Sequence, residues 1–212
     1  MYTPQSFKED RIEVLHDFIK SNPLGLLISN GAEGPLATAI PFHLVNDGSE
    51  FGMFQAHLAR ANPHWQSIDN QNILIVFQGT DAYISPSWYP SKLEHGKVVP
   101  TWNYIMIQAR GIAKVMDDPE WIKRQITALT NQQEQDKSDP WKVSYAPESY
   151  IDTELRAIVG LEIKISQMEG KWKLSQNRNL QDRRGVAENL QAEGNTEMSS
   201  LVRQYGRLDE TT

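Results

Sequence analysis

The sequence predicts an α+β protein in which short strands form a β-barrel and helices surround it. Strand candidates occupy much of the first 116 residues, and Gly, Asn, Asp or Pro separates them. Strands and helices do not alternate regularly, which disfavours a doubly wound parallel sheet. The rest of the chain is more helical. We therefore expect residues 1–117 to form the barrel core, and residues 118–212 to add a helical segment and a hairpin at 158–174 that completes the same domain.

A helix begins the chain and a series of strands follows it. Ile12, Leu15 and Ile19 recur at helical spacing within residues 8–20, and Pro23 follows the segment as a stop signal. Strands are expected at 24–29, 36–45, 50–57, 73–78, 82–85 and 101–116. The connections between them should include a hairpin turn at 46–48 and a short helix at 61–68. Gly111 marks an expected bulge or bend in the last strand.

The second part of the chain carries clear helix signals around one hairpin. Asp118 followed by Pro119 is typical of a helix start, and the helix should run to about Gln135. Apolar residues alternate with polar ones from Val159 to Ile165, and residues 168–170 have the composition of a turn. The remaining helices are expected at 148–157, 180–192 and 196–205.

Composition excludes several classes of protein. The 212 residues carry a net charge of −6 and include no cysteine, which excludes disulfides, thiolate metal sites and cysteine nucleophiles and fits a reducing cytoplasm. The N-terminus is acidic where a signal peptide would be basic, and the longest apolar runs are only strand-sized. We expect a soluble cytoplasmic protein without a membrane segment.

Familiar catalytic motifs are missing from the sequence. GxGxxG, GxxxxGK[ST], HExxH and GxSxG do not occur, which disfavours a Rossmann dinucleotide site, a P-loop nucleotidase, a zincin and an α/β-hydrolase. The five histidines form no recognised metal spacing. No pair of helices has a helix-turn-helix pattern, and the acidic charge also disfavours direct DNA binding. We predict no catalytic residue and no metal ligand.

A basic stretch at residues 171–184 stands out in this acidic chain. It holds five cations against one anion, Asp182. Concentrated positive charge beside amide and hydroxyl groups suits a small anionic ligand better than a long polyanion. Lys171, Lys173 and Ser175 should share one face of a strand. The alternative is a solvated strand face followed by a helix with a basic start, although cations there oppose the helix dipole.

Two further motifs contain residues suited to ligand binding. HLARANPHW (57–65) places Arg60 just before a helix start, where an anion would meet its guanidinium and free backbone N–H groups. AYISPSWY (82–89) and VPTWNY (99–104) gather aromatic side chains that suit a planar heterocycle. The alternatives are a surface arginine in the first case, and a core or a subunit interface in the second.

Taken in order, MYTP, HLARANPHW, YISPSWY, VPTWNY and KWKLSQNR resemble the PaiB family of FMN-binding negative transcriptional regulators. The resemblance runs from residue 1 to about residue 190. It implies an FMN-binding split β-barrel similar to that of pyridoxamine-phosphate oxidases. It also implies a homodimer with FMN at the subunit interface.

The resemblance also implies which residues bind FMN. Arg60, with His57 and Asn62 beside it, is expected at the phosphate, and residues 102–104 at the isoalloxazine ring. The phosphate or the flavin edge is expected to contact four residues of the basic stretch. The full expected set is His57, Arg60, Asn62, Trp102, Asn103, Tyr104, Lys173, Ser175, Gln176 and Asn177.

Three functions compete at this point. The first is a flavin- or redox-linked regulator that acts through a protein partner, and the second is a flavin-dependent oxidoreductase of the flavin reductase or haem-degrading type. In such an enzyme FMN would supply the chemistry, so no catalytic acid or base need appear in the sequence. The third, a repressor that binds DNA directly, is the least favoured because of the acidic charge.

Overall fold

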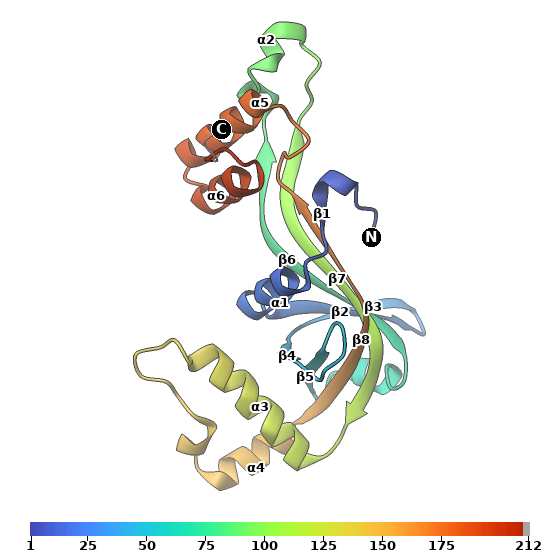
Figure 1. Ribbon diagram of the computed structural model, residues 1–212. Coiled ribbons are helices and arrows are strands. Elements are labelled where there is room, and N and C mark those ends of the chain that lie inside the picture. Colours follow the sequence, from blue (N-terminus) through green and yellow to red (C-terminus); the bar gives the residue numbers. More distant parts are fainter. Residues whose placement is uncertain (210–212) are drawn as a thin grey trace. The chain divides into compact units, whose positions relative to one another are not determined.

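The computed structural model describes residues 1–209 and contains helices together with antiparallel strands (Figure 1). The chain divides into two compact units. Among the described residues, the terminal unit comprises 1–11, 78–107 and 169–209, and the central unit comprises 12–77 and 108–168. Three long strands contribute residues to both units, and each unit is described separately below.

The strands follow one hydrogen-bonded order, β3-β2-β6-β7-β8-β5-β4, and β1 pairs with β8 outside that order. Their bounds are β1 (Lys8–Glu9), β2 (Leu24–Gly31), β3 (Gly34–Pro41), β4 (His43–Val45), β5 (Met53–Ala59), β6 (Asn72–Ile84), β7 (Thr101–Met116) and β8 (Ile158–Lys173). The helices are α1 (Ile12–Ser21), α2 (Ser91–His95), α3 (Pro119–Glu134), α4 (Glu148–Arg156), α5 (Leu180–Ala192) and α6 (Thr196–Tyr205). Short 3-10 turns are η1 (Gln5–Phe7), η2 (Pro63–Ser67), η3 (Pro86–Trp88) and η4 (Val143–Tyr145).

Three phenylalanines form the centre of the central unit. Phe42, Phe54 and Phe77 are fully buried, and their ring centroids lie 5.5–5.6 Å apart in tilted or edge-on pairs. Such geometries are the favoured ones for aromatic pairs. The close packing depends on Gly25, because a Cβ there would lie 2.7 Å from the Phe77 ring. Alternating burial along β5 and β6 places these rings on the inner face.

A second cluster in the central unit joins α3 and α4, which lie near each other in Figure 1. Its buried members are Trp121, Ile122, Val143, Ile151 and Leu155. Gly160 on β8 belongs to the same packing, because a Cβ there would lie 2.3 Å from the Trp121 ring. Helix α3 begins as predicted, with the Asp118 side chain accepting a hydrogen bond from the Glu120 backbone N–H.

In the terminal unit, α5 and α6 pack together and bury the apolar residues Val186, Ala187, Leu190, Met198 and Val202. Asn179 caps α5 by accepting from the Asp182 N–H, and the Ser199 hydroxyl of α6 donates to the Ala187 carbonyl of α5. Gly185 packs against the Trp88 carbonyl oxygen, which a Cβ would approach to 2.1 Å. These contacts hold the end of the basic stretch in a defined position.

Most predicted elements are present. Four have other bounds or another type, and a fifth, the hairpin at 158–174, is absent. The first helix begins at Ile12, because Lys8 and Glu9 instead pair with β8 as β1. The expected strand at 36–45 is divided at Phe42 into β3 and β4. The strands expected at 73–78 and 82–85 are one strand, β6. The short helix expected at 61–68 is the 3-10 turn η2.

The hairpin expected at 158–174 is wrong, because β8 runs unbroken from Ile158 to Lys173. Apart from Gly160, the buried positions along β8 alternate as Val159, Leu161, Ile163 and Ile165, and then as Met168, Gly170 and Trp172. The alternation therefore changes phase at residues 166–167 without a reversal of the chain. Gly170 does not adopt a positive φ, so the composition at 168–170 reflects packing and no turn.

Gly111 lies in the middle of β7, where the sequence predicts a bulge or bend. A Cβ at this position would lie 2.3 Å from the Lys164 carbonyl oxygen of β8. The structure therefore requires glycine here for the close approach of two strands. Within residues 1–209, no helix has the length and apolar character needed to cross a membrane.

His64 gives the central unit a predictable dependence on pH. Its ring is buried between the Ser29 and Thr38 hydroxyls, at 2.8 Å from Nε2 and 2.7 Å from Nδ1. Burial lowers the pKa of His64 below its ordinary value of 6.5. The His64 ring therefore takes up a proton more readily in the unfolded chain than in the folded protein. The stability contributed by the neutral ring is fully present above the unfolded-state pKa, and it is lost as the pH falls through the folded-state pKa.

We expect the free energy of unfolding to decrease from about pH 7.5 to about pH 5.5, with a His64 contribution no steeper than about 1.4 kcal/mol per pH unit. Urea unfolding at several pH values measures this slope. His64→Gln, which does not titrate, should be flatter over the same range. An equal slope in the variant would contradict the assignment.

Candidate functional site

The predicted site residues fall in two groups, one in each unit. His57, Arg60 and Asn62 belong to the central unit. The other seven, which are Trp102, Asn103, Tyr104, Lys173, Ser175, Gln176 and Asn177, belong to the terminal unit.

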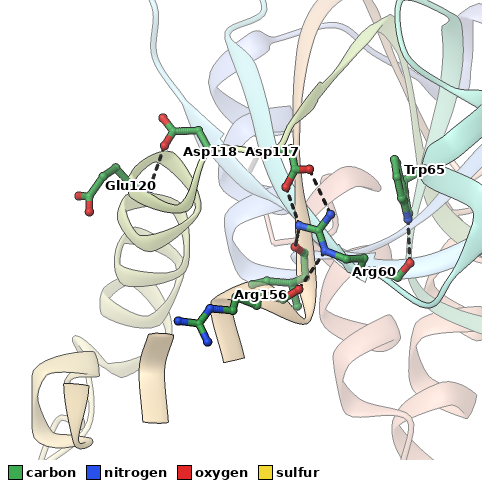
Figure 2. A network of polar contacts seen from close by, with 7 residues as sticks. Arg60, Trp65, Asp117, Asp118, Glu120 and Arg156 are labelled. Atoms are coloured by element: carbon green, nitrogen blue, oxygen red, sulfur yellow. Dashed lines mark hydrogen bonds and ion pairs between the residues drawn. The ribbon is translucent and has the colours of Figure 1, made fainter. Parts of the chain in front are cut away.

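Arg60 lies just after β5 and binds three other segments of the central unit (Figure 2). Its Nη1 and Nη2 donate to the Asp117 carboxylate at 3.1 and 2.5 Å. Its Nε donates to the Arg156 carbonyl at 2.9 Å, and Nη2 also donates to the Ile158 carbonyl at 3.0 Å. The hydrogen bond to Asp117 raises the pKa of Arg60, and the Arg60 guanidinium lowers the pKa of Asp117.

These contacts make Arg60 a clamp that joins the end of β5 to the end of β7 and to the α4–β8 connection. They engage four of the guanidinium N–H groups and leave one for a ligand. The Trp65 indole also donates to the Arg60 carbonyl at 3.0 Å. The role of Arg60 at a phosphate stays a prediction, and its structural role was not visible in the sequence because Asp117 lies 57 residues away.

His57 and Asn62 also have partners within the central unit. The His57 Nδ1 is 2.9 Å from the Oε1 of Gln125, a buried residue of α3. The Asn62 side chain accepts from the His64 N–H at 3.0 Å and caps η2. The expected helix start after HLARA is therefore present as a capped 3-10 turn, and Asn62 positions that turn.

In the terminal unit, residues 102–104 point to opposite sides of β7, as alternation in a strand requires. Trp102 is 54% exposed and lies edge-on to Tyr83, with ring centroids 5.8 Å apart. Together with Tyr104 it lines a shallow hollow of about 290 Å³, whose other residues are Gln78, Asp81 and Met106. Asn103 is fully buried on the other side. Exposed aromatic rings beside a hollow can stack on a planar ligand.

Asn103 pairs with Ser175 across the terminal unit. The Asn103 Nδ2 donates to the Ser175 hydroxyl oxygen at 3.0 Å. The Ser175 hydroxyl can instead donate to the Asn103 Oδ1, which lies 3.2 Å away. Ser175 is 4% exposed and adopts a φ of 66°, a conformation rare outside glycine. The buried pair therefore fixes a strained turn at the exit of β8.

Gln176 completes that turn through the backbone. Its Oε1 accepts from the Leu174 N–H at 2.7 Å, and its Nε2 donates to the Trp172 carbonyl at 2.6 Å. These bonds engage both ends of the amide, so Gln176 shapes the turn that precedes Asn177 and Arg178. Its predicted contact with the cofactor stays a prediction.

Lys173 lies at the end of β8 and has neutral partners. Its Nζ donates to the Thr101 hydroxyl at 2.6 Å and to the Trp102 carbonyl. Burial, followed by the nearby charges of Lys171 and Arg178, lowers the pKa of Lys173. A cation in such surroundings favours an anionic ligand, because the anion would relieve both the desolvation and the repulsion.

A pocket of about 140 Å³ in the terminal unit unites four of the predicted site residues with six that were not in the expected FMN-binding set. We call it the basic pocket. Its lining residues are Phe7, Tyr89, Val99, Pro100, Thr101, Asn103, Lys173, Ser175, Asn177 and Arg178. None of these is a carboxylate. Among the six are Tyr89 and Arg178. Arg178 belongs to the basic stretch, but its contact with Tyr89 joins segments too far apart in the sequence to form a local motif.

A larger cavity of about 530 Å³ lies beside α3 in the central unit, and none of the predicted site residues lines it. Its lining residues include Lys123, Lys142, Val143 and Ile151. The larger cavity therefore lacks the residues predicted to bind a ligand. The cations, hydroxyl and amide groups of the basic pocket favour that pocket as the candidate site.

Solved structures identify the fold as the split β-barrel that the sequence predicts. A FAD and haem binding protein of Mycobacterium smegmatis matches with a TM-score of 0.58 and 16% identity, over 78% of this chain and 73% of that one. A conserved hypothetical protein of Mycobacterium tuberculosis matches with a TM-score of 0.58 and 15% identity, over 84% and 94%.

Sequence comparisons define the family. Residues 1–167 match the family described as "Putative FMN-binding domain". The protease synthase and sporulation protein PAI 2 of Bacillus subtilis is 32% identical over 203 residues, which cover 95% of each chain. An uncharacterized protein of Emericella nidulans is 32% identical over 248 aligned positions, covering 98% of each chain. The chain belongs to this FMN-binding family, which confirms the resemblance found in its motifs.

The residues of the terminal unit fit the chemistry of FMN. A phosphate monoester needs cations and hydrogen-bond donors, and the basic pocket offers Lys173, Arg178, Ser175 and Asn177. The pocket is smaller than the range of about 300–1,000 Å³ typical of sites for whole ligands. It can therefore receive only a small group such as a phosphate, and a ring would need another surface.

The pairing of Asn103 with Ser175 can be tested by unfolding. Ser175→Ala leaves the buried Asn103 amide without its partner and should reduce the free energy of unfolding by about 1–3 kcal/mol. Adding Asn103→Leu should recover part of that loss, because both polar groups are then removed. Urea unfolding of the four proteins in this double-mutant cycle gives the coupling energy, and strictly additive losses would show that the two residues act independently.

Proposed function

We propose that the protein binds FMN and acts as a flavin- or redox-linked negative regulator through a protein partner, without reading DNA itself. The match of residues 1–167 to an FMN-binding family carries this proposal. The sporulation-protein name of the Bacillus subtilis relative supports a regulatory role. The net charge of −6 disfavours a surface that follows a DNA backbone.

The proposed FMN-binding set is the one that the sequence predicts. Trp102 and Tyr104 would offer faces to the isoalloxazine ring, as the exposed Trp102 ring supports. Arg60 would use its remaining N–H group at the phosphate, with His57 and Asn62 holding the surrounding segment. Lys173, Ser175 and Asn177 would contribute a cation, a hydroxyl and an amide. FMN, when bound, supplies reversible electron transfer, and the chain binds and orients it.

We also propose a cytoplasmic homodimer with FMN at the subunit interface. The central unit exposes two large apolar side chains on one face of β2: Leu24 and Leu26 are 65% and 38% exposed. An exposed apolar patch of this kind favours association. The absence of cysteine from all 212 residues is compatible with a reducing compartment.

Flavin titration tests the proposal directly. The purified protein should bind FMN with a shifted flavin absorption spectrum and quenched or altered flavin fluorescence, and size measurement in parallel should give a dimer. Absence of FMN uptake at millimolar concentrations would contradict flavin binding. Rapid oxidation of NADH or NADPH in the presence of FMN would instead favour the alternative function, a flavin-dependent oxidoreductase.

Arg60→Ala should weaken FMN binding at least about tenfold, because it removes a charge-assisted contact worth about 1.5–3 kcal/mol. Asp117→Asn is the matched control, since it weakens the clamp but keeps the Arg60 charge. Its FMN affinity should not fall. Equal FMN affinity of wild type and Arg60→Ala would remove Arg60 from the site and leave it the role of a clamp.

A further inference from the structure

Arg178 has an aromatic partner in place of an acidic one. It lies in the loop between β8 and α5, and its guanidinium carbon is 4.6 Å from the centroid of the Tyr89 ring. Within residues 1–209, no ion pair includes Arg178, Lys171 or Lys173. Stacking on an aromatic face holds a guanidinium in position and leaves its N–H groups available for an anion.

Neutral partners hold the two lysines in a similar way. The Lys171 Nζ donates to the Tyr2 carbonyl at 3.2 Å and lies 5.3 Å from the centroid of the Tyr104 ring. The Lys173 Nζ donates to a hydroxyl and a carbonyl. Three cations therefore gather at the end of β8 without a compensating carboxylate in the lining of the basic pocket.

Asp182 is the one carboxylate within the basic stretch at residues 171–184, and other groups already bind it. It is 2% exposed and accepts from the Ser91 N–H at 3.1 Å, from the Ser91 hydroxyl at 2.8 Å and from the Asn179 amide at 3.2 Å. These three donors orient its oxygens toward Ser91 and the start of α5. The positive charge of the basic pocket therefore remains available to a ligand.

Tyr89 adds a second, independent sign of a ligand. Its side chain lines the basic pocket and is 2% exposed, yet within the described part of the chain its hydroxyl has no partner that meets hydrogen-bond geometry. Burial raises the pKa of Tyr89, whereas the charge of Arg178 and the approach of its N–H groups to the hydroxyl oppose the rise. A guanidinium can only donate, so within residues 1–209 the hydroxyl proton still lacks an acceptor. The hydroxyl is therefore a neutral donor at pH 7, and a buried donor of this kind is costly unless a partner arrives.

We propose that the basic pocket is a binding site for a phosphate monoester, in which Arg178, held in place by Tyr89, recognises the phosphate beside Lys173. A dianion suits several cations and donors better than a single carboxylate group does. The volume of about 140 Å³ admits a phosphate group but no strand of nucleic acid. The phosphate belongs either to FMN itself, in which case the inference rests on the proposed function, or to a separate phosphorylated small molecule.

The first arm of the test compares FMN with riboflavin, which lacks the phosphate. If the pocket holds the phosphate of FMN, Arg178→Gln should raise the Kd for FMN at least about tenfold and leave that for riboflavin unchanged. Arg184→Gln is the matched control, because it removes a cation of the same stretch that does not line the pocket. Tyr89→Leu should act like Arg178→Gln, since it removes the stacking surface. Circular dichroism verifies that each variant is folded.

In the second arm, calorimetry measures the binding of inorganic phosphate to the FMN-loaded protein. If the pocket serves a separate ligand, the wild type and Arg184→Gln should bind phosphate, and Arg178→Gln should bind it at least about tenfold more weakly. The inference is overturned if Arg178→Gln matches the wild type for both FMN and phosphate. If the wild type binds no flavin, the proposed function is refuted but the inference is not. The phosphate titration of wild type and Arg178→Gln is then carried out on the flavin-free protein and still tests the basic pocket.

Discussion

The terminal unit depends on one constraint, which is that positive charge is gathered in a small, partly closed pocket without an acidic partner. Burying a cation is costly unless other groups replace its water. Here the replacements are carbonyl and hydroxyl oxygens for Lys173 and an aromatic face for Arg178. They position the cations but do not neutralise them. The strained turn at Ser175, fixed by the buried Asn103, is the backbone feature that brings these cations together.

In the central unit, by contrast, the arginine has an acidic partner. Arg60 is paired with Asp117 and two carbonyl groups, so its charge is largely satisfied within the fold. Two arginines with similar prominence in the sequence thus differ in what they can still bind. Arg60 keeps one N–H group for the proposed phosphate contact, whereas no ion pair within residues 1–209 includes Arg178. Both facts depend on partners that no local motif reveals.

The sequence predicts elements well where local signals are strong and complete. The bounds of β7, α5 and α6 are those expected, because long periodic segments and clear caps define them. The sequence-based prediction was wrong where a turn-like composition reflects packing inside a strand. Gly170 suggested a turn, but it lies within the single strand β8. Asn103, Lys173, Ser175 and Asn177 were identified and do share a pocket. Arg178 was recognised only as part of the basic stretch and its partner Tyr89 was not identified, because their contact joins distant segments.

The central claim is that the basic pocket holds charge which only an anion can compensate. The most direct measurement is the pKa of the Lys173 side chain, followed by NMR of labelled lysine in the flavin-free protein and after FMN or phosphate is added. We expect a pKa below the ordinary 10.5 in the free protein, because burial, Lys171 and Arg178 all lower it. Binding of the anion should raise it. An ordinary pKa that does not respond to either ligand would contradict the account.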